Sequence, residues 1–246
     1  MRWLHRAWRY RLGSNAAEVR FVRTMLNQGD LAVDLGVHKG GYLYWLRKAV
    51  GATGQVVGFE PQQRLLEKVR LLSCHRGWSN VKLECLAVSD KAGLCQLGTP
   101  AGKIDSPGAR LISKQSDDVE IDNKEWSTTS VQAVTLDDYF ANRKQPVRFI
   151  KCDVEGEELN VFNGSLELLK TDNPILMFEC EERHLRSHSV SDVFDLLHSF
   201  GYQGYFFSSN GILPLKEFSL TKHQSVCEGN VVDTKSYCNN FAFVKS

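Results

Sequence analysis

The chain has 246 residues, of which 42% are hydrophobic and 24% charged, so its composition excludes a disordered or fibrous protein. A net charge of +1 gives no overall positive field for nucleic acid, and no apolar run approaches the ~20 residues of a membrane-spanning helix. Seven cysteines without a C-x-x-C pair, and the lack of a signal peptide, favour reduced thiols and a cytoplasmic location. We predict one domain over residues 1–246, with no nucleic-acid partner and no transmembrane segment; the sequence carries no signal for an oligomeric state.

The first 28 residues are predicted to form an N-terminal helical segment. Residues 1–13 place four arginines among two tryptophans and a tyrosine. This pattern fits peripheral contact with a membrane surface, but a helix packed on the domain with solvated arginines is the favoured interpretation. Residues 15–28 carry Val19, Val22 and Leu26 at helical spacing, which predicts an amphipathic helix.

A glycine loop follows the first predicted strand. Asp34, Gly36 and Gly40 form the pattern D-x-G-x-x-x-G, and residues 42–48 can continue as a helix. A strand, a glycine turn and a helix start together expose backbone amides that can hold a polar ligand. The second glycine of the dinucleotide motif is absent, because a valine and His38 occupy its place. We therefore predict a loop for another nucleotide cofactor, in which His38 positions the cofactor rather than reacts.

The next two predicted strands supply candidates for binding an adenosine. The second strand ends at Glu60 and Pro61. A carboxylate at that point can accept hydrogen bonds from both ribose hydroxyls of an adenosine cofactor, and the proline stops the strand. The third strand is predicted over residues 81–88, so Ala87 and Val88 at its end are candidates for the adenine pocket.

The rest of the chain continues the alternation of helices and strands. Residues 94–134 alternate short apolar pieces with glycine, proline and serine, which predicts irregular strands or an insertion at the sheet edge, about residues 95–134. Thr135 is predicted to cap a short helix. Further helices are predicted over residues 62–75, 157–170 and 192–200, and terminal strands, partly antiparallel, over residues 202–207, 212–218 and 241–244.

The fourth and fifth predicted strands both end in carboxylates. Asp153 and Glu155 follow the fourth strand, and Glu179 ends the fifth, with Glu181 and His184 shortly after it. The carboxyl ends of such strands face the crevice where open α/β sheets bind ligands. These five residues are therefore candidates for a general base. Their spacing is not typical of metal ligands, so no metal site is predicted.

The order of these motifs resembles that of the FkbM family of S-adenosylmethionine (SAM)-dependent methyltransferases, over about residues 18–206. The resemblance implies an α/β fold with a Rossmann-like methyltransferase sheet: mostly parallel, seven-stranded, with an antiparallel C-terminal strand and helices on both faces. One departure is that the family usually has Ala-Asn where this chain has Val37 and His38. The segments that carry the resemblance are 34–40 (DLGVHKG), 58–61 (GFEP), 87–90 (AVSD), 135–138 (TLDD) and 150–158 (IKCDVEGEE).

The resemblance also implies an activity and a cofactor. The expected reaction is methylation of a hydroxyl on a sugar, glycolipid or natural-product small molecule, with SAM as the methyl donor. Asp153 ranks first as base, because such enzymes place a residue there beside the reacting methyl; binding the methionine amino group or capping the next helix are its alternative roles. The predicted catalytic residues are Asp153, Glu155, Glu179 and His184, and the predicted cofactor-binding residues are Asp34, Gly36, His38, Gly40, Glu60, Pro61, Ala87, Val88 and Asp153.

Two other functions compete with methyl transfer. A nicotinamide-dependent oxidoreductase also needs a glycine loop and an acid after the second strand, but His38 and Asp34 argue against it. A non-catalytic SAM-fold module would bind a partner without turnover. The acceptor is expected to be a small molecule or a glycan, on which Trp126, Tyr205 or Phe206 could stack, although aromatic side chains lie more often in a core.

Overall fold

The computed structural model describes residues 13, 15–102, 105–106, 108–112, 126–227, 230–231 and 236–245. The arginine-rich start of the chain, residues 1–12, lies outside this set, so the two interpretations of that segment stay predictions. Within the described ranges, no helix is both long enough and apolar enough to cross a membrane.

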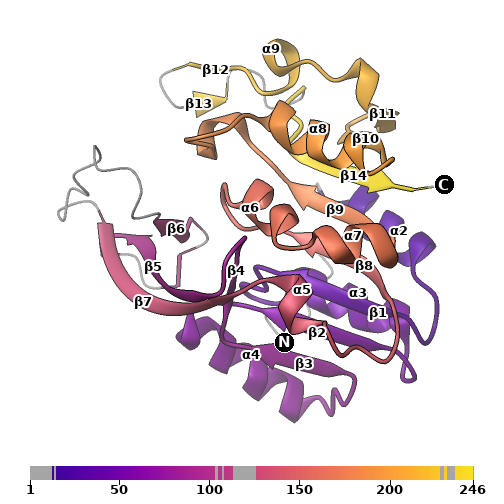
Figure 1. The fold of residues 1–246 in the computed structure, drawn as a ribbon, viewed down its shortest axis with the longest axis vertical. Helices are drawn as coiled ribbons and strands as arrows, with labels where there is room; N and C mark the ends of the chain where they lie inside the picture. Colours follow the sequence, from indigo (N-terminus) through magenta and orange to yellow (C-terminus); the bar gives the residue numbers. More distant parts are fainter. Residues whose placement is uncertain are drawn as a thin grey trace.

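A mixed sheet of eight strands runs through the described part of the molecule in the order β11-β10-β14-β9-β8-β1-β2-β3 (Figure 1). The strands from β9 to β3 pair in parallel, whereas β14 is antiparallel to both of its neighbours. This confirms the predicted methyltransferase sheet, to which β11 adds an eighth strand at the edge. The strands are β1 (Leu31–Leu35), β2 (Gln55–Phe59), β3 (Val81–Glu84), β8 (Val147–Cys152), β9 (Ile175–Glu179), β10 (Gln203–Ser208), β11 (Gly211–Pro214) and β14 (Asn240–Val244).

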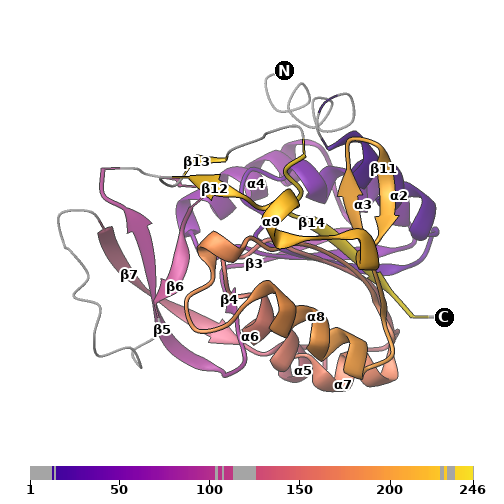
Figure 2. The same ribbon diagram turned by 90° about the horizontal axis from the view of Figure 1, so that it is seen from above.

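Helices cover both faces of this sheet. Figure 2 shows α2, α3 and α4 on one face and α5 to α8 on the other. Most lie close to their predicted ranges. The helices are α2 (Ala16–Met25), α3 (Gly41–Val50), α4 (Gln63–His75), α5 (Leu136–Tyr139), α6 (Glu158–Asn163), α7 (Leu166–Thr171), α8 (Val190–Ser199) and α9 (Leu220–His223), with short 3-10 turns η1 (Glu182–His184) and η2 (Leu215–Glu217).

Each central strand contributes to two hydrophobic cores, because successive side chains in a strand point to opposite faces. In β1, Val33 and Leu35 pack on the α5–α8 side, and Ala32 packs on the α2–α4 side. In β14, Phe243 joins the first core and Ala242 the second. The sheet is thus buried on both faces, which leaves the carboxyl ends of its parallel strands as the place for a site.

A second sheet of the described residues has the order β4-β7-β5-β6 and lies beside the main sheet in both ribbon views. The prediction of one strand over residues 81–88 is wrong, because the chain leaves the main sheet after β3 and β4 pairs with β7 instead. The predicted edge insertion holds the other strands of this sheet. Its members are β4 (Ala87–Val88), β5 (Gly93–Pro100), β6 (Arg110–Ile112) and β7 (Trp126–Val134); a further short pair is β12 (Val226–Cys227) and β13 (Asn230–Val231).

The helix predicted over residues 157–170 is also wrong in one respect, since it is two helices. The break lies at Gly164, where a Cβ would be 2.2 Å from the carbonyl oxygen of Ser89. The carboxylate of Asp137 then accepts hydrogen bonds from the first-turn amides of α7, at 2.9 Å from each nitrogen.

The predicted cap of α5 is confirmed, because the Thr135 hydroxyl accepts a hydrogen bond from the amide of Asp138 at 3.0 Å. The strand predicted over residues 212–218 is shorter, because η2 follows β11.

Candidate active site

A cavity lies at the carboxyl ends of β1, β2 and β8 and is closed on its other side by the second sheet. Its volume is about 690 Å³ when all the space between atoms is counted, including space that opens to solvent. The predicted site residues that line it are Gly36, His38, Glu60, Pro61, Ala87, Val88, Asp153 and Glu155. The cavity therefore brings together strand ends that are far apart in the sequence.

The loop after β1 is pressed between the ends of β2 and β8. The amide of Gly36 donates a hydrogen bond to the carbonyl oxygen of Phe59 at 3.0 Å, and the amide of Asp153 donates one to Leu35 at 3.1 Å. Gly36 has φ +75°, and a Cβ on it would lie 1.9 Å from the carbonyl oxygen of Asp153. Only glycine fits this position. Gly40 precedes α3 and does not line the cavity.

Glu60 is held at the end of β2 by two backbone amides. Its Oε2 accepts a hydrogen bond from the amide of His38 at 2.7 Å, and its Oε1 accepts one from the amide of Gln62 at 3.0 Å. Only 3% of the residue is exposed, and burial raises the pKa of its carboxyl while the two amides oppose that rise. A carboxylate oxygen can accept more than one hydrogen bond, so both oxygens retain accepting capacity toward the cavity.

Lys151 neutralises the carboxylates beneath the cavity. Its ammonium group donates to Oδ2 of Asp153 at 2.8 Å and lies 5.0 Å from the ring centre of Tyr42. Burial opposes its charge, but Asp153 and Asp34 outweigh burial and raise the pKa of Lys151. Asp34 is 1% exposed and neither of its oxygens has a hydrogen-bond partner among the described residues. Burial raises the pKa of Asp34 to about 7.

Glu155 and His184 lie in contact beside the cavity. Nδ1 of His184 lies 3.2 Å from Oε2 of Glu155, and of the two only Glu155 lines the cavity. Burial, together with the nearby carboxylate of Asp153, raises the pKa of Glu155 to about 7. Burial lowers the pKa of His184. A carboxylate that titrates near neutral pH can exchange a proton with a bound ligand.

Glu179 belongs to a polar network beside the cavity and does not line it. The side-chain amide of Asn239 donates to Glu179 and to Glu181, at 2.8 Å to each. Arg183 and Tyr237 also donate to Glu181. Burial and the neighbouring carboxylates raise the pKa of Glu179, whereas these donors outweigh burial and lower the pKa of Glu181. Of the two carboxyl groups, Glu179 therefore binds a proton more tightly than Glu181.

Several lining residues were not predicted from the sequence. Among them, Leu97, Arg110 and Leu111 come from the second sheet. Their segments lack a clear period, and only the pairing of β5 with β6 and β7 brings them to the cavity. The aromatic candidates lie elsewhere or are occupied: Phe206 is fully buried, Tyr205 lies in β10 away from the cavity, and the Trp126 ring packs against Arg110.

In the ranges that the structure describes, no group of three or more histidine, cysteine, aspartate or glutamate side chains is arranged to hold a metal ion.

A doubly wound sheet with an antiparallel strand β14, a glycine loop after β1 and an acid after β2 defines the class of Rossmann-like methyltransferases. The sequence model of the methyltransferase FkbM domain matches residues 34–203, and the chain belongs to this family. This confirms the resemblance seen in the sequence. No match was found among curated proteins.

Two solved structures show the same fold. The methyltransferase FkbM from Methylobacillus flagellatus KT is 14% identical, with a TM-score of 0.53 over 98% of this chain and 53% of the other. Precorrin-6y C5,15-methyltransferase from Geobacter metallireducens GS-15 is 9% identical, with a TM-score of 0.50 over 95% of this chain and 90% of the other. The present chain thus spans about half the length of the first of these proteins.

Family membership makes SAM the expected cofactor, and the residues of the cavity fit it. Glu60 holds a fixed carboxylate that would accept hydrogen bonds from ribose hydroxyls, and Gly36 lets the loop pack against the backbone of Asp153 beside the cavity. The buried Ala87 and Val88 line the cavity and would give an apolar wall for an adenine ring. The carboxylates around the cavity complement the positive sulfonium and ammonium groups of SAM, which is an electrostatic match.

Proposed function

We propose that the protein transfers the methyl group of SAM to a hydroxyl oxygen of a sugar, glycolipid or natural-product small molecule. One observation carries this proposal: a single cavity brings together Gly36, Glu60 and Glu155. Gly36 belongs to the glycine loop, Glu60 is the acid proposed to bind the ribose, and Glu155 is a carboxyl group with a pKa of about 7. Membership of the FkbM methyltransferase family supports it. The same membership disfavours a nicotinamide-dependent oxidoreductase.

Each residue type has a defined task in such a transfer. The bound cofactor supplies an electrophilic methyl group, so the protein must orient an acceptor hydroxyl and take up its proton. Glu60 and the loop at Gly36 bind the adenosine part. Lys151 holds the carboxylate of Asp153 in place at the end of β8, which suits Asp153 for binding and positioning.

Glu155, rather than Asp153, is proposed as the proton acceptor. Oδ2 of Asp153 already binds the ammonium group of Lys151. Glu155 lines the cavity, and its partner His184 contacts Oε2, which leaves Oε1 to accept the proton of a hydroxyl. The resemblance to the family ranked Asp153 first as the general base, and this proposal gives that role to Glu155 instead.

The first test is a calorimetric titration of the protein with S-adenosylhomocysteine (SAH) and, separately, with NADH. Micromolar binding of SAH without binding of NADH would support the proposal. Binding of NADH alone, or of neither compound, would contradict it. SAH binding without methyl transfer to any hydroxylated acceptor would instead favour the non-catalytic binding module.

Replacing Glu60 is expected to weaken cofactor binding. The Glu60→Ala variant removes the carboxylate that would accept a hydrogen bond from the ribose. One such charge-assisted bond is worth about 1.5–3 kcal/mol, so the Kd for SAH should rise roughly 10- to 100-fold. The Glu60→Gln variant retains one acceptor oxygen and should lose less. Calorimetry with SAH measures both effects.

The matched control is Glu67→Ala, which removes an exposed carboxylate on α4. Its SAH affinity should equal that of the unchanged protein. A folded Glu60→Ala variant with unaltered affinity would exclude the ribose role of Glu60.

The rate of methyl transfer should depend on the ionisation of Glu155. Because its carboxyl must be ionised to accept a proton and its pKa is raised to about 7, kcat should rise with pH through about 7. The Glu155→Gln variant should lose about 10²–10⁴-fold in kcat and lose this rise, while its SAH affinity stays unchanged. A pH–rate profile measures the effect.

An exposed glutamate on η2 supplies the control, since Glu217→Gln should leave the profile unaltered. If Asp153→Asn abolishes the rise and Glu155→Gln does not, Asp153 is the base and this assignment is wrong.

A further inference from the structure

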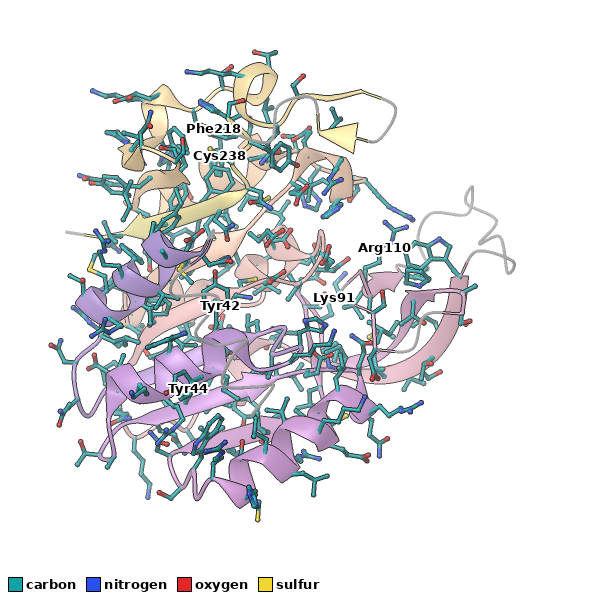
Figure 3. The ribbon with its side chains drawn as sticks, turned by 180° about the vertical axis from the view of Figure 1, so that it is seen from behind. Tyr42, Tyr44, Lys91, Arg110, Phe218 and Cys238 are labelled. Atoms are coloured by element: carbon teal, nitrogen blue, oxygen red, sulfur yellow. The ribbon has the colours of Figure 1, made fainter. Side chains whose placement is uncertain are left out.

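The two walls of the cavity carry opposite charge. The strand ends contribute carboxylates, among them Glu60, Asp153 and Glu155. The facing wall contributes Arg110 from β6, and the charge of Arg186, an exposed residue after η1 that does not line the cavity, acts on Arg110. In Figure 3, Arg110 projects from the second sheet toward the segment that follows β9. A ligand that spans the cavity would therefore meet carboxylates at one end and the guanidinium of Arg110 at the other.

The guanidinium of Arg110 is held ready for an anion. It stacks on the ring of Trp126, with 4.2 Å between its central carbon and the ring centre. Stacking uses one face of the planar group and leaves its N–H donors, which lie in the plane, able to bind an oxyanion through two parallel hydrogen bonds. The stack also fixes the side chain, so little conformational entropy is lost when an anion binds.

Within the part of the chain that the structure describes, Arg110 has no carboxylate at ion-pair distance. Arg186 also forms no ion pair with any residue that the structure describes, whereas Arg183 pairs with Glu181. Burial and the positive charge of Arg186 lower the pKa of Arg110. The negative charge of Glu155 opposes this effect on Arg110, and Glu155 also contacts His184.

We propose that the methyl acceptor is an acid, whose carboxylate or phosphate group is bound by Arg110 while its hydroxyl faces Glu155. This inference rests on the proposed function and narrows its substrate class. The anion is held on the wall opposite Glu60, so it does not compete with the cofactor's ribose. The stacked guanidinium sets the orientation of the acceptor.

The inference is tested by binding to the SAH-loaded protein. Saturation-transfer NMR titrations would use D-glucuronate, D-glucose 6-phosphate and D-glucose as probes that differ in their charged group. We expect at least one of the two acids to bind 10-fold or more tightly than glucose, and its identity distinguishes a carboxylate from a phosphate. The Arg110→Gln variant should lose this 10-fold preference, and Arg110→Lys should recover only part of it.

Arg148→Gln is the control, because it removes an exposed arginine at the start of β8, at the opposite end of the strand from the cavity. It should retain the preference, and all variants should keep the SAH affinity of the unchanged protein. If glucose binds as tightly as both acids, or if Arg110→Gln leaves the preference intact, the inference is wrong although the methyltransferase proposal stands. If the unchanged protein does not bind SAH, both the methyltransferase proposal and this inference are wrong.

Discussion

Replacing Lys151 with methionine is expected to lower the free energy of unfolding at pH 7 by about 3–5 kcal/mol, because it removes one partner of a buried ion pair. Lys151 is 3% exposed, and the carboxylates of Asp153 and Asp34 balance its charge. Without it, these carboxylates would share a buried site with no cation. Urea denaturation followed by circular dichroism measures the loss.

The sign of the pH dependence follows from the same groups. Uncompensated carboxylates in the Lys151→Met variant take up protons more readily in the folded state, so the loss should be smaller at pH 5 than at pH 7. The Lys151→Arg variant keeps the positive charge, so its loss in the free energy of unfolding should be smaller. Lys144→Met, at an exposed lysine, is the control. A loss below about 1 kcal/mol for Lys151→Met would show that its charge does not support the carboxylates.

Substituting Gly36 should have the largest effect on the cofactor loop. The Cβ of Gly36→Ala would overlap the carbonyl oxygen of Asp153 at 1.9 Å, and the positive φ adds about 1–3 kcal/mol of strain. The loop must move away from β8 to relieve the overlap. We expect the Kd for SAH to rise at least ~100-fold, which is about 2.7 kcal/mol, as measured by calorimetry.

Gly77 provides a matched comparison. It also has a positive φ, +63°, but a Cβ there would meet no atom within 4 Å. Gly77→Ala should therefore share the backbone strain without the overlap, and its SAH affinity should be unaltered. Equal SAH affinities for the two variants would mean that the close packing of Gly36 against the carbonyl oxygen of Asp153 is not needed for SAH binding.

Features that depend on neighbours in the sequence were predicted well. The glycine pattern after β1, the acid that ends β2 and the Thr135 cap each involve residues within a few positions of one another. The same holds for α2, α4 and α8, whose apolar spacing is helical. The errors arose where a distant contact decided the outcome: Gly164 breaks a helix because Ser89 packs against it, and β4 leaves the main sheet because β7 pairs with it.

The sequence by itself determined the family, the main sheet and which carboxylates end its strands, because these are written in local motifs and their order. Only the tertiary structure decided which of those carboxylates meet a cation, a histidine or a cavity. Lys151 faces Asp34 across paired strands, and Arg110 reaches the neighbourhood of Glu155 from another sheet. Burial and the nearest charge set a carboxyl's pKa, and both depend on residues far away in the chain. For this reason Asp153 ranked first as the general base from the sequence, whereas we propose Glu155 for that role from the folded site.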